Sequence, residues 1–154
     1  MEKPGVGKTV QNHHFPKAQT DGHSYDPYCI RVTARRLTDR YHLPLIITEN
    51  GYGRADVLEA DGTVHDQYRI EHLRETIRQM KLGIEEGAML VGYCPWSAMD
   101  LVSTREGITI RYGFIYVDRD EDDEKAKHSE MKRYRKDSFY WYKKVIASNG
   151  EDLN

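Results

Sequence analysis

The segment LPLIITENGYG, residues 43–53, joins a short apolar run to a cluster of polar residues and glycines. Leu45, Ile46 and Ile47 are consecutive and apolar, a pattern typical of a parallel strand that is covered on both faces. Ligands of parallel α/β folds bind beyond the carboxyl ends of the strands, and Glu49 stands at that end here. Its position predicts either a catalytic carboxylate or an acid that caps the following turn, and the spacing alone leaves both interpretations open.

The regions around this strand predict an alternation of helices and strands. Apolar residues recur at helical spacing in three segments, 28–41, 67–86 and 138–147. The run AMLVGYCPW at 88–96 predicts a second buried strand, and residues 112–118 are also strand-like. Because strands separated by a helix form a right-handed parallel crossover, the fold class is predicted to be α/β with parallel strands.

The apolar faces of the three helices are the expected core. They are Ile30, Ala34, Leu37 and Tyr41 in the first helix, Ile70, Leu73, Ile77, Met80 and Ile84 in the second, and Phe139, Tyr142, Val145 and Ile146 in the third. Asp66 is expected to cap the second helix, and Gly87 to end it in the left-handed conformation. Two strands are a small sheet for so much apolar helix surface, so we expect part of a larger α/β architecture.

Composition and charge argue against several classes of protein. The 154 residues include 23 Lys and Arg against 25 Asp and Glu, and the net charge of −2 offers no basic surface for nucleic acid. No apolar run approaches the roughly 20 residues of a membrane span, and the first residues hold no apolar secretory segment. Cys29 and Cys94 lie far apart and lack metal-ligand spacing. We therefore expect a cytoplasmic protein with no cofactor and no metal.

Two segments are expected to be loops. Residues 1–24 carry no periodicity and predict a loop or disordered segment ahead of a domain at 25–154. The motif GVGKT at 5–9 lacks the earlier glycine and the preceding strand of a phosphate-binding loop, so that interpretation is rejected. Residues 118–136 pass from an acidic run to a basic run, and they predict a flexible surface loop.

The second strand also ends in residues suited to binding. Trp96 and Ser97 close it, and Asp100 and Ser103 follow. An indole ring can stack on the apolar face of a sugar, and a carboxylate such as Glu49 can attack the anomeric carbon as positive charge develops there. Taken alone, Trp96 is better explained by packing in the core, and that alternative stays open.

Four motifs resemble glycoside hydrolase family 1, in the order in which they occur in its C-terminal third. They are PLIITENG at 44–51, VGYCPWSAMDLVS at 91–103, RYGFIYVDRD at 111–120 and RKDSFYWYKKVIASNGEDL at 135–153. The similarity runs from about residue 17 to 153 and is greatest to the bacterial 6-phospho-β-glucosidase branch. The resemblance implies a partial (β/α)8 TIM barrel, with these strands as barrel strands 7 and 8.

The resemblance also implies roles for single residues in hydrolysing a β-glucoside or 6-phospho-β-glucoside. Glu49 matches the catalytic nucleophile of a retaining β-glycosidase, and Trp96 matches the tryptophan under the sugar. Tyr112 matches the phosphate-binding tyrosine of the phospho-branch. Ser103 stands where members acting on plain glucosides carry an acid. A carboxylate there would repel a 6-phosphate, whereas a serine hydroxyl can donate to one.

The chain departs from the family pattern in two places. Ile110 replaces a lysine that usually precedes the phosphate-binding tyrosine, which leaves Arg105 and Arg111 as the candidate cations. Retaining hydrolysis also needs a second carboxyl about 5–5.5 Å from the first. The family carries this acid/base in an Asn-Glu-Pro motif, which does not occur in the 154 residues. Asp100 and Glu106 are other carboxylates, but nothing in the sequence marks either as the acid.

The sequence leaves more than one function open. The first hypothesis is a retaining glycosidase in which this chain supplies Glu49 to a complete barrel and has little or no turnover alone. The alternative is a non-catalytic assembly module that self-associates or complements an N-terminal barrel half, since open sheet edges invite such contacts. A remnant with no selected function is the third.

Overall fold

The structure, a computed structural model, describes residues 26–104, 107–119 and 130–154. The predicted loop at 1–24, as well as Arg105 and Glu106, therefore lie outside the described residues. In chain order the elements are α1 (Tyr28–Tyr41), β1 (Leu45–Asn50), α2 (Gln67–Glu85), β2 (Leu90–Pro95), β3 (Ile115–Val117), β4 (Arg133–Arg135) and α4 (Asp137–Ala147). None of the described helices is both long and apolar enough to cross a membrane.

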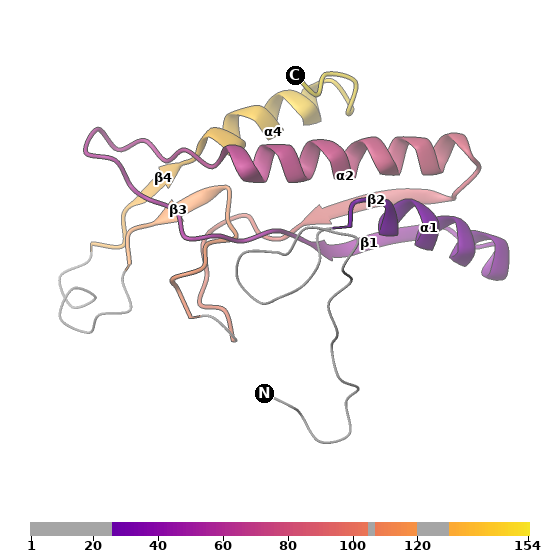
Figure 1. The fold of residues 1–154 in the computed structure, drawn as a ribbon, viewed down its shortest axis with the longest axis horizontal. Coiled ribbons are helices and arrows are strands. Elements are labelled where there is room, and N and C mark those ends of the chain that lie inside the picture. Colours follow the sequence, from indigo (N-terminus) through magenta and orange to yellow (C-terminus); the bar gives the residue numbers. More distant parts are fainter. Residues whose placement is uncertain (1–25, 105–106, 120–129) are drawn as a thin grey trace.

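The strands β1 and β2 form a parallel pair, as the alternation of elements predicts. Leu45 pairs with Leu90 at one end and Asn50 with Pro95 at the other. The connection between the strands contains α2, the longest helix, which runs alongside them and contacts both α1 and α4 (Figure 1). Gly87 follows α2 with a φ of 94°, the left-handed conformation expected at the end of this helix.

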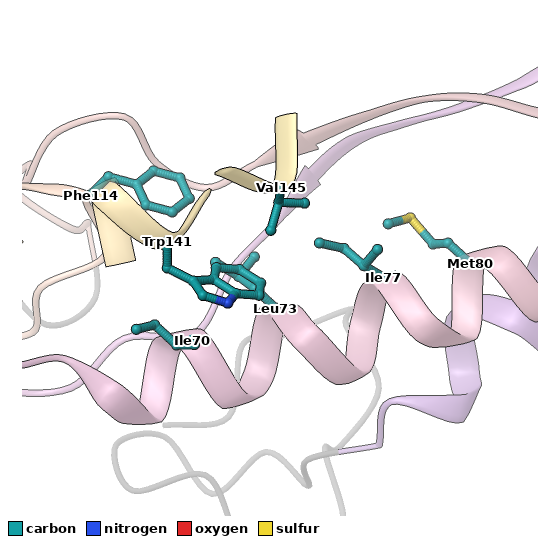
Figure 2. Close-up of a cluster of buried hydrophobic side chains, with 7 residues drawn as sticks. All are labelled: Ile70, Leu73, Ile77, Met80, Phe114, Trp141 and Val145. Carbon is teal, nitrogen blue, oxygen red and sulfur yellow. The ribbon is translucent and has the colours of Figure 1, made fainter. Parts of the chain in front are cut away.

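The core lies between α2, α4 and the strand pair. Its buried side chains are Ile70, Leu73, Ile77, Met80, Phe114, Trp141 and Val145 (Figure 2). Four of the five residues predicted for the inner stripe of α2 are in this cluster, but Ile84 is 48% exposed, so that prediction is wrong at the last turn. Ile146 is likewise 65% exposed, because it follows buried Val145 directly and consecutive helical residues point about 100° apart.

The described residues cover one face of the strand pair and leave the other face exposed. Ile47, Leu90 and Tyr93 pack against the core cluster, whereas Ile46 is 58% and Val91 72% exposed. The prediction that β1 is covered on both faces is therefore wrong for the described part of the chain. The exposed apolar residues on this face of the strand pair agree with the expectation of a larger architecture.

A short antiparallel pair follows the long segment after β2. Tyr116 of β3 pairs with Tyr134 of β4, and Lys136 comes next at the start of α4 with no exposed surface. The prediction of a flexible surface loop at 118–136 is therefore wrong at its C-terminal end, and residues 120–129 lie outside the described part. The basic run does not lie wholly on the surface, because Lys136 is buried and paired with the carboxylates of Asp56 and Asp100.

Candidate active site

The polar residues at the carboxyl ends of β1 and β2 lie on neighbouring strands joined by hydrogen bonds. The Asn50 carbonyl accepts a bond from the Trp96 N–H at 2.7 Å, and the Asn50 side-chain oxygen accepts one from the Tyr93 hydroxyl at 2.9 Å. Glu49 directly precedes Asn50 in β1. The register therefore brings Glu49, in β1, and Trp96, directly after β2, to the same edge of the sheet.

The surroundings of Glu49 and Trp96 weigh against their structural interpretations. Glu49 is exposed, and no described residue donates a hydrogen bond to its carboxylate. Trp96 is 38% exposed, and the tryptophan of the core is Trp141. The peptide bond between Trp96 and Ser97 is cis. Both side chains are thus left available at the strand ends rather than used in a turn cap or in the core.

The two glycines of the opening segment allow the loop after β1 to pass close to these residues. A Cβ atom added to Gly51 would lie 2.1 Å from the Trp96 carbonyl oxygen. One added to Gly53 would lie 2.7 Å from the Tyr112 ring and equally close to Ile110. Because glycine has no side chain, the loop can approach the Trp96 backbone at Gly51 and the Tyr112 ring at Gly53.

Replacing Gly51 by alanine is expected to destabilise the chain by about 1–3 kcal/mol, because the new methyl group would overlap backbone that cannot yield. The matched control is Gly83→Ala in α2, where an added Cβ meets its nearest atom at 3.6 Å. That change is expected to stabilise by roughly 0.5–1 kcal/mol, since alanine is the better helix former. Urea unfolding of both variants checks the pair, and equal effects would contradict the close approach.

Tyr112 joins the same region through its backbone. Its carbonyl oxygen accepts hydrogen bonds from the Ser97 N–H at 3.0 Å and from Arg69 Nη1 at 2.8 Å. Ser103 lies in a turn, where its backbone exchanges hydrogen bonds with Gly107 at 2.7 and 3.1 Å. The bond from Ser97 thus places the Tyr112 backbone beside the residue that follows Trp96, while Ser103 lies in a turn with Gly107.

Arg111, one of the two candidate cations for a phosphate, is committed to the protein. It is 6% exposed and donates to the carbonyl oxygens of Val117 at 2.7 Å and Arg119 at 2.6 Å. It also lies 3.4 Å from the Asp100 carboxylate, which receives further bonds from the N–H groups of Gly113 and Val117. Arg111 therefore cannot replace the missing lysine, and Asp100 is a structural carboxylate rather than an exposed acid.

A buried ionic network beneath the loops is a feature that the sequence analysis missed. Lys136 Nζ lies 2.5 Å from Asp56 and 2.8 Å from Asp100, and all three side chains are at most 1% exposed. Arg69 contacts Asp56 at 3.1 Å and Asp66 at 2.8 Å. Burial lowers the pKa of Lys136, nearby Arg69 acts in the same direction, and both carboxylates oppose the shift.

Asp66 belongs to this network instead of capping α2. No cap hydrogen bond is made by its side chain. Its carboxylate accepts bonds from Arg69 Nε at 2.8 Å and from the Ser138 N–H and hydroxyl at 2.9 and 2.5 Å. The prediction that the Asp66 side chain caps α2 is therefore wrong. The spacing of Asp66 and Arg69, three residues apart at the start of a helix, is the one signal that could have indicated the pair.

His72, on α2, makes the free energy of unfolding depend on pH. Its ring stacks on Tyr52 of the loop after β1 at 5.2 Å, and burial lowers its pKa to about 4, with Arg69 acting in the same direction. The unfolded chain binds this proton near pH 6.5, so His72 favours unfolding increasingly as the pH falls from about 6.5 to 4.

We expect the free energy of unfolding to fall by about 3 kcal/mol over that pH range because of His72. His72→Leu should remove this part of the slope, measured by urea unfolding at several pH values. His65→Gln is the control, because the pKa of exposed His65 is raised by Asp137, which gives the opposite sign. An unchanged slope in His72→Leu would show that another group is responsible.

Among the described residues, no three or more potential metal-ligating side chains come together. The side chains at and near the strand ends include an exposed carboxylate, an exposed indole and a tyrosine. This combination suits the binding of a sugar ring and attack on its anomeric carbon.

Comparisons with known proteins identify relatives over almost the whole chain. The family model of glycosyl hydrolase family 1 matches residues 1–151. The chain is 49% identical to the aryl-phospho-β-D-glucosidase BglC of Bacillus subtilis, covering 97% of this chain and 30% of that protein. It is also 49% identical to the 6-phospho-β-glucosidase AscB of Escherichia coli, covering 96% and 30%.

A solved structure shows the same arrangement. The family 1 β-glucosidase of Thermotoga maritima superposes with a TM-score of 0.80 at 37% identity, over 93% of this chain and 31% of that one. The chain thus spans about 30% of the length of the curated relatives that it matches. Its parallel strands and helices are a partial (β/α)8 barrel, as the sequence predicts. The protein belongs to glycosyl hydrolase family 1.

Proposed function

We propose that this chain supplies the nucleophile and part of the sugar site of a retaining β-glycosidase that hydrolyses 6-phospho-β-glucosides. The observation that carries the proposal is the register of β1 and β2, which places Glu49 and Trp96 at one edge of the sheet. Family membership supports the same proposal, because relatives that are 49% identical to this chain are named phospho-β-glucosidases.

The reaction assigned to Glu49 proceeds in two displacements. Its carboxylate attacks the anomeric carbon while the bond to the aglycone oxygen breaks, which gives a glycosyl ester. Water then attacks the same carbon and releases Glu49 and the sugar. Both steps require an acid/base to protonate the leaving oxygen and then deprotonate water, and no residue of this chain is assigned that role. Trp96 would support the ring from below through its exposed indole.

Tyr112 and Ser103 are the residues that we assign to the phosphate. A phenol and an alcohol can each donate a hydrogen bond to a phosphate oxygen. Neither brings a positive charge, Ile110 is apolar, and Arg111 is used internally. We therefore expect phosphate recognition to depend on these neutral donors and on cations outside the described residues, with Arg105 as the candidate in this chain.

The proposal is tested by complementation. The chain is co-expressed with the part of Bacillus subtilis BglC that lies outside the matched region, a pair called the complemented enzyme below. Hydrolysis of p-nitrophenyl β-glucoside 6-phosphate and of the unphosphorylated glucoside is then measured. We expect turnover by the complemented enzyme, faster with the phosphorylated substrate, and at least about 100-fold less by the chain alone, because it contains no assigned general acid. Equal rates with and without the BglC part would contradict the proposal.

A second candidate function is assembly without catalysis. The exposed Ile46 and Val91 on the open face of the strand pair favour it, since such apolar surface is usually covered. Size-exclusion chromatography with light scattering distinguishes the two: a stable monomer that becomes active only when complemented favours the glycosidase, and a defined homo-oligomer without any turnover favours assembly.

A further inference from the structure

We propose that Arg69 and Lys136 are positioning residues that hold the loops after β1 and β2 in one arrangement. These loops carry or adjoin the candidate site residues Glu49, Trp96 and Tyr112. The consequence for catalysis rests on the proposed function, whereas the structural role can be measured without it.

Arg69 joins the two loops through backbone oxygens. Its Nη1 donates to the carbonyl of Tyr52 at 2.9 Å and to that of Tyr112 at 2.8 Å, and its Nη2 donates to that of Arg111 at 3.0 Å. Tyr52 belongs to the loop after β1, whereas the other two belong to the segment after β2. A single guanidinium therefore bonds to the backbones of both loops.

Lys136 makes the same connection through side chains. Its ammonium bonds to Asp56 in the loop after β1 and to Asp100 in the segment after β2. Asp56 is shared, because its second oxygen accepts a bond from the Tyr68 hydroxyl at 2.7 Å and Arg69 also contacts it. The two cations thus meet at Asp56.

Both cations lie at the start of a helix, Arg69 in the first turn of α2 and Lys136 directly before α4. Asp66, at the start of α2, binds Arg69 and is bound in turn by Ser138 of α4. The Lys136 backbone N–H donates to the Phe114 carbonyl at 3.0 Å. The loops are therefore tied to the packed helices through these two side chains.

The cost of burying these charges argues that geometry, rather than stability, is their main contribution. The network consists of Arg69, Arg111 and Lys136 with Asp56, Asp66 and Asp100, three charges of each sign. Buried ion pairs are often no more stabilising than apolar side chains of the same volume. A planar guanidinium holds its donors in a rigid fork, so it can set the directions of several carbonyls at once, whereas an ammonium is a compact charge on a flexible stem.

The test replaces Arg69 by lysine, which keeps the charge and removes the fork. Amide hydrogen exchange of the purified chain is followed at Ser97 and Arg111, whose N–H groups bond to the carbonyls of Tyr112 at 3.0 Å and Arg54 at 2.8 Å. We expect these amides to exchange at least about tenfold faster, with the amides of α2 much less affected. Arg78→Lys, at an exposed position of α2, is the matched control and should change neither.

Unchanged exchange at both amides, or equal acceleration throughout the chain, would overturn the positioning role. In the complemented enzyme, Arg69→Lys should raise KM more for the phosphorylated than for the unphosphorylated substrate, because the Tyr112 carbonyl keeps its bond from Ser97 but loses the guanidinium that ties it to Tyr52 and Arg111. A folding defect alone would lower the active fraction and leave both KM values unchanged, which would overturn the catalytic consequence. If the wild-type complemented enzyme has no turnover, the proposed function fails, and hydrogen exchange still decides the positioning role.

Discussion

Replacing Glu49 by glutamine in the complemented enzyme is expected to lower kcat by at least about 10⁴-fold, since an amide cannot form the glycosyl ester. The change is nearly isosteric and falls on an exposed side chain, so the free energy of unfolding should stay within about 0.5 kcal/mol. Turnover of the aryl 6-phospho-β-glucoside and urea unfolding measure the two quantities. The expected result is thus a large loss of activity with no loss of stability.

Glu71→Gln is the matched control, because Glu71 is an exposed glutamate of α2 away from the strand ends. It should leave both activity and stability unchanged. A further check uses Glu49→Ala with added azide, which can attack the open anomeric carbon and restore turnover with the product in the opposite configuration. If Glu49→Gln keeps more than a tenth of the wild-type kcat, Glu49 is not the nucleophile.

Replacing Lys136 by methionine is expected to destabilise the chain by about 3–5 kcal/mol, because Asp56 and Asp100 would remain buried without their shared cation. For a chain of this length, the corresponding fall in Tm is on the order of 10 °C. Thermal and urea unfolding of the purified chain measure the change.

Two further variants separate charge from packing at this position. Lys143→Met changes an exposed lysine of α4 and should have almost no effect. Combining Lys136→Met with Asp56→Asn removes one charge of each sign, leaves Arg69 paired with Asp66 and Arg111 with Asp100, and should recover a large part of the lost stability. If the double variant is as unstable as the sum of the two single changes, the loss comes from packing and not from an unpaired carboxylate.

The elements of this fold were predictable where hydrophobic spacing is regular. The predicted helix at 28–41 matches α1, and the strand before Glu49 continues through Asn50 as β1. Two physical causes account for the errors at four apolar positions. Ile84 and Ile146 each directly follow a buried residue, Gly83 and Val145, and consecutive helical residues point about 100° apart, so both side chains turn away from the core. Ile46 and Val91 belong to a sheet face that the described residues leave uncovered.

The candidate site was only partly predictable. Glu49 and Trp96 stand at strand ends, so their proximity follows from a parallel pair in register. The ionic network could not be foreseen, because Lys136 occurs in a basic run and Asp56 in a polar loop, and both have the sequence context of surface residues. Only the fold brings Lys136 within 2.5 Å of Asp56, 80 positions away in the chain.

The most direct measurement is to trap the glycosyl ester. A fluorinated β-glucoside 6-phosphate with a dinitrophenolate leaving group needs no general acid, and the fluorine slows hydrolysis of the ester. The complemented enzyme is treated with this reagent, digested and analysed by mass spectrometry. We predict one fluoroglucosyl phosphate group per complex, attached to Glu49 and absent from Glu49→Gln. A label on any other residue, or equal labelling of the variant, would contradict the assignment of Glu49 as the nucleophile.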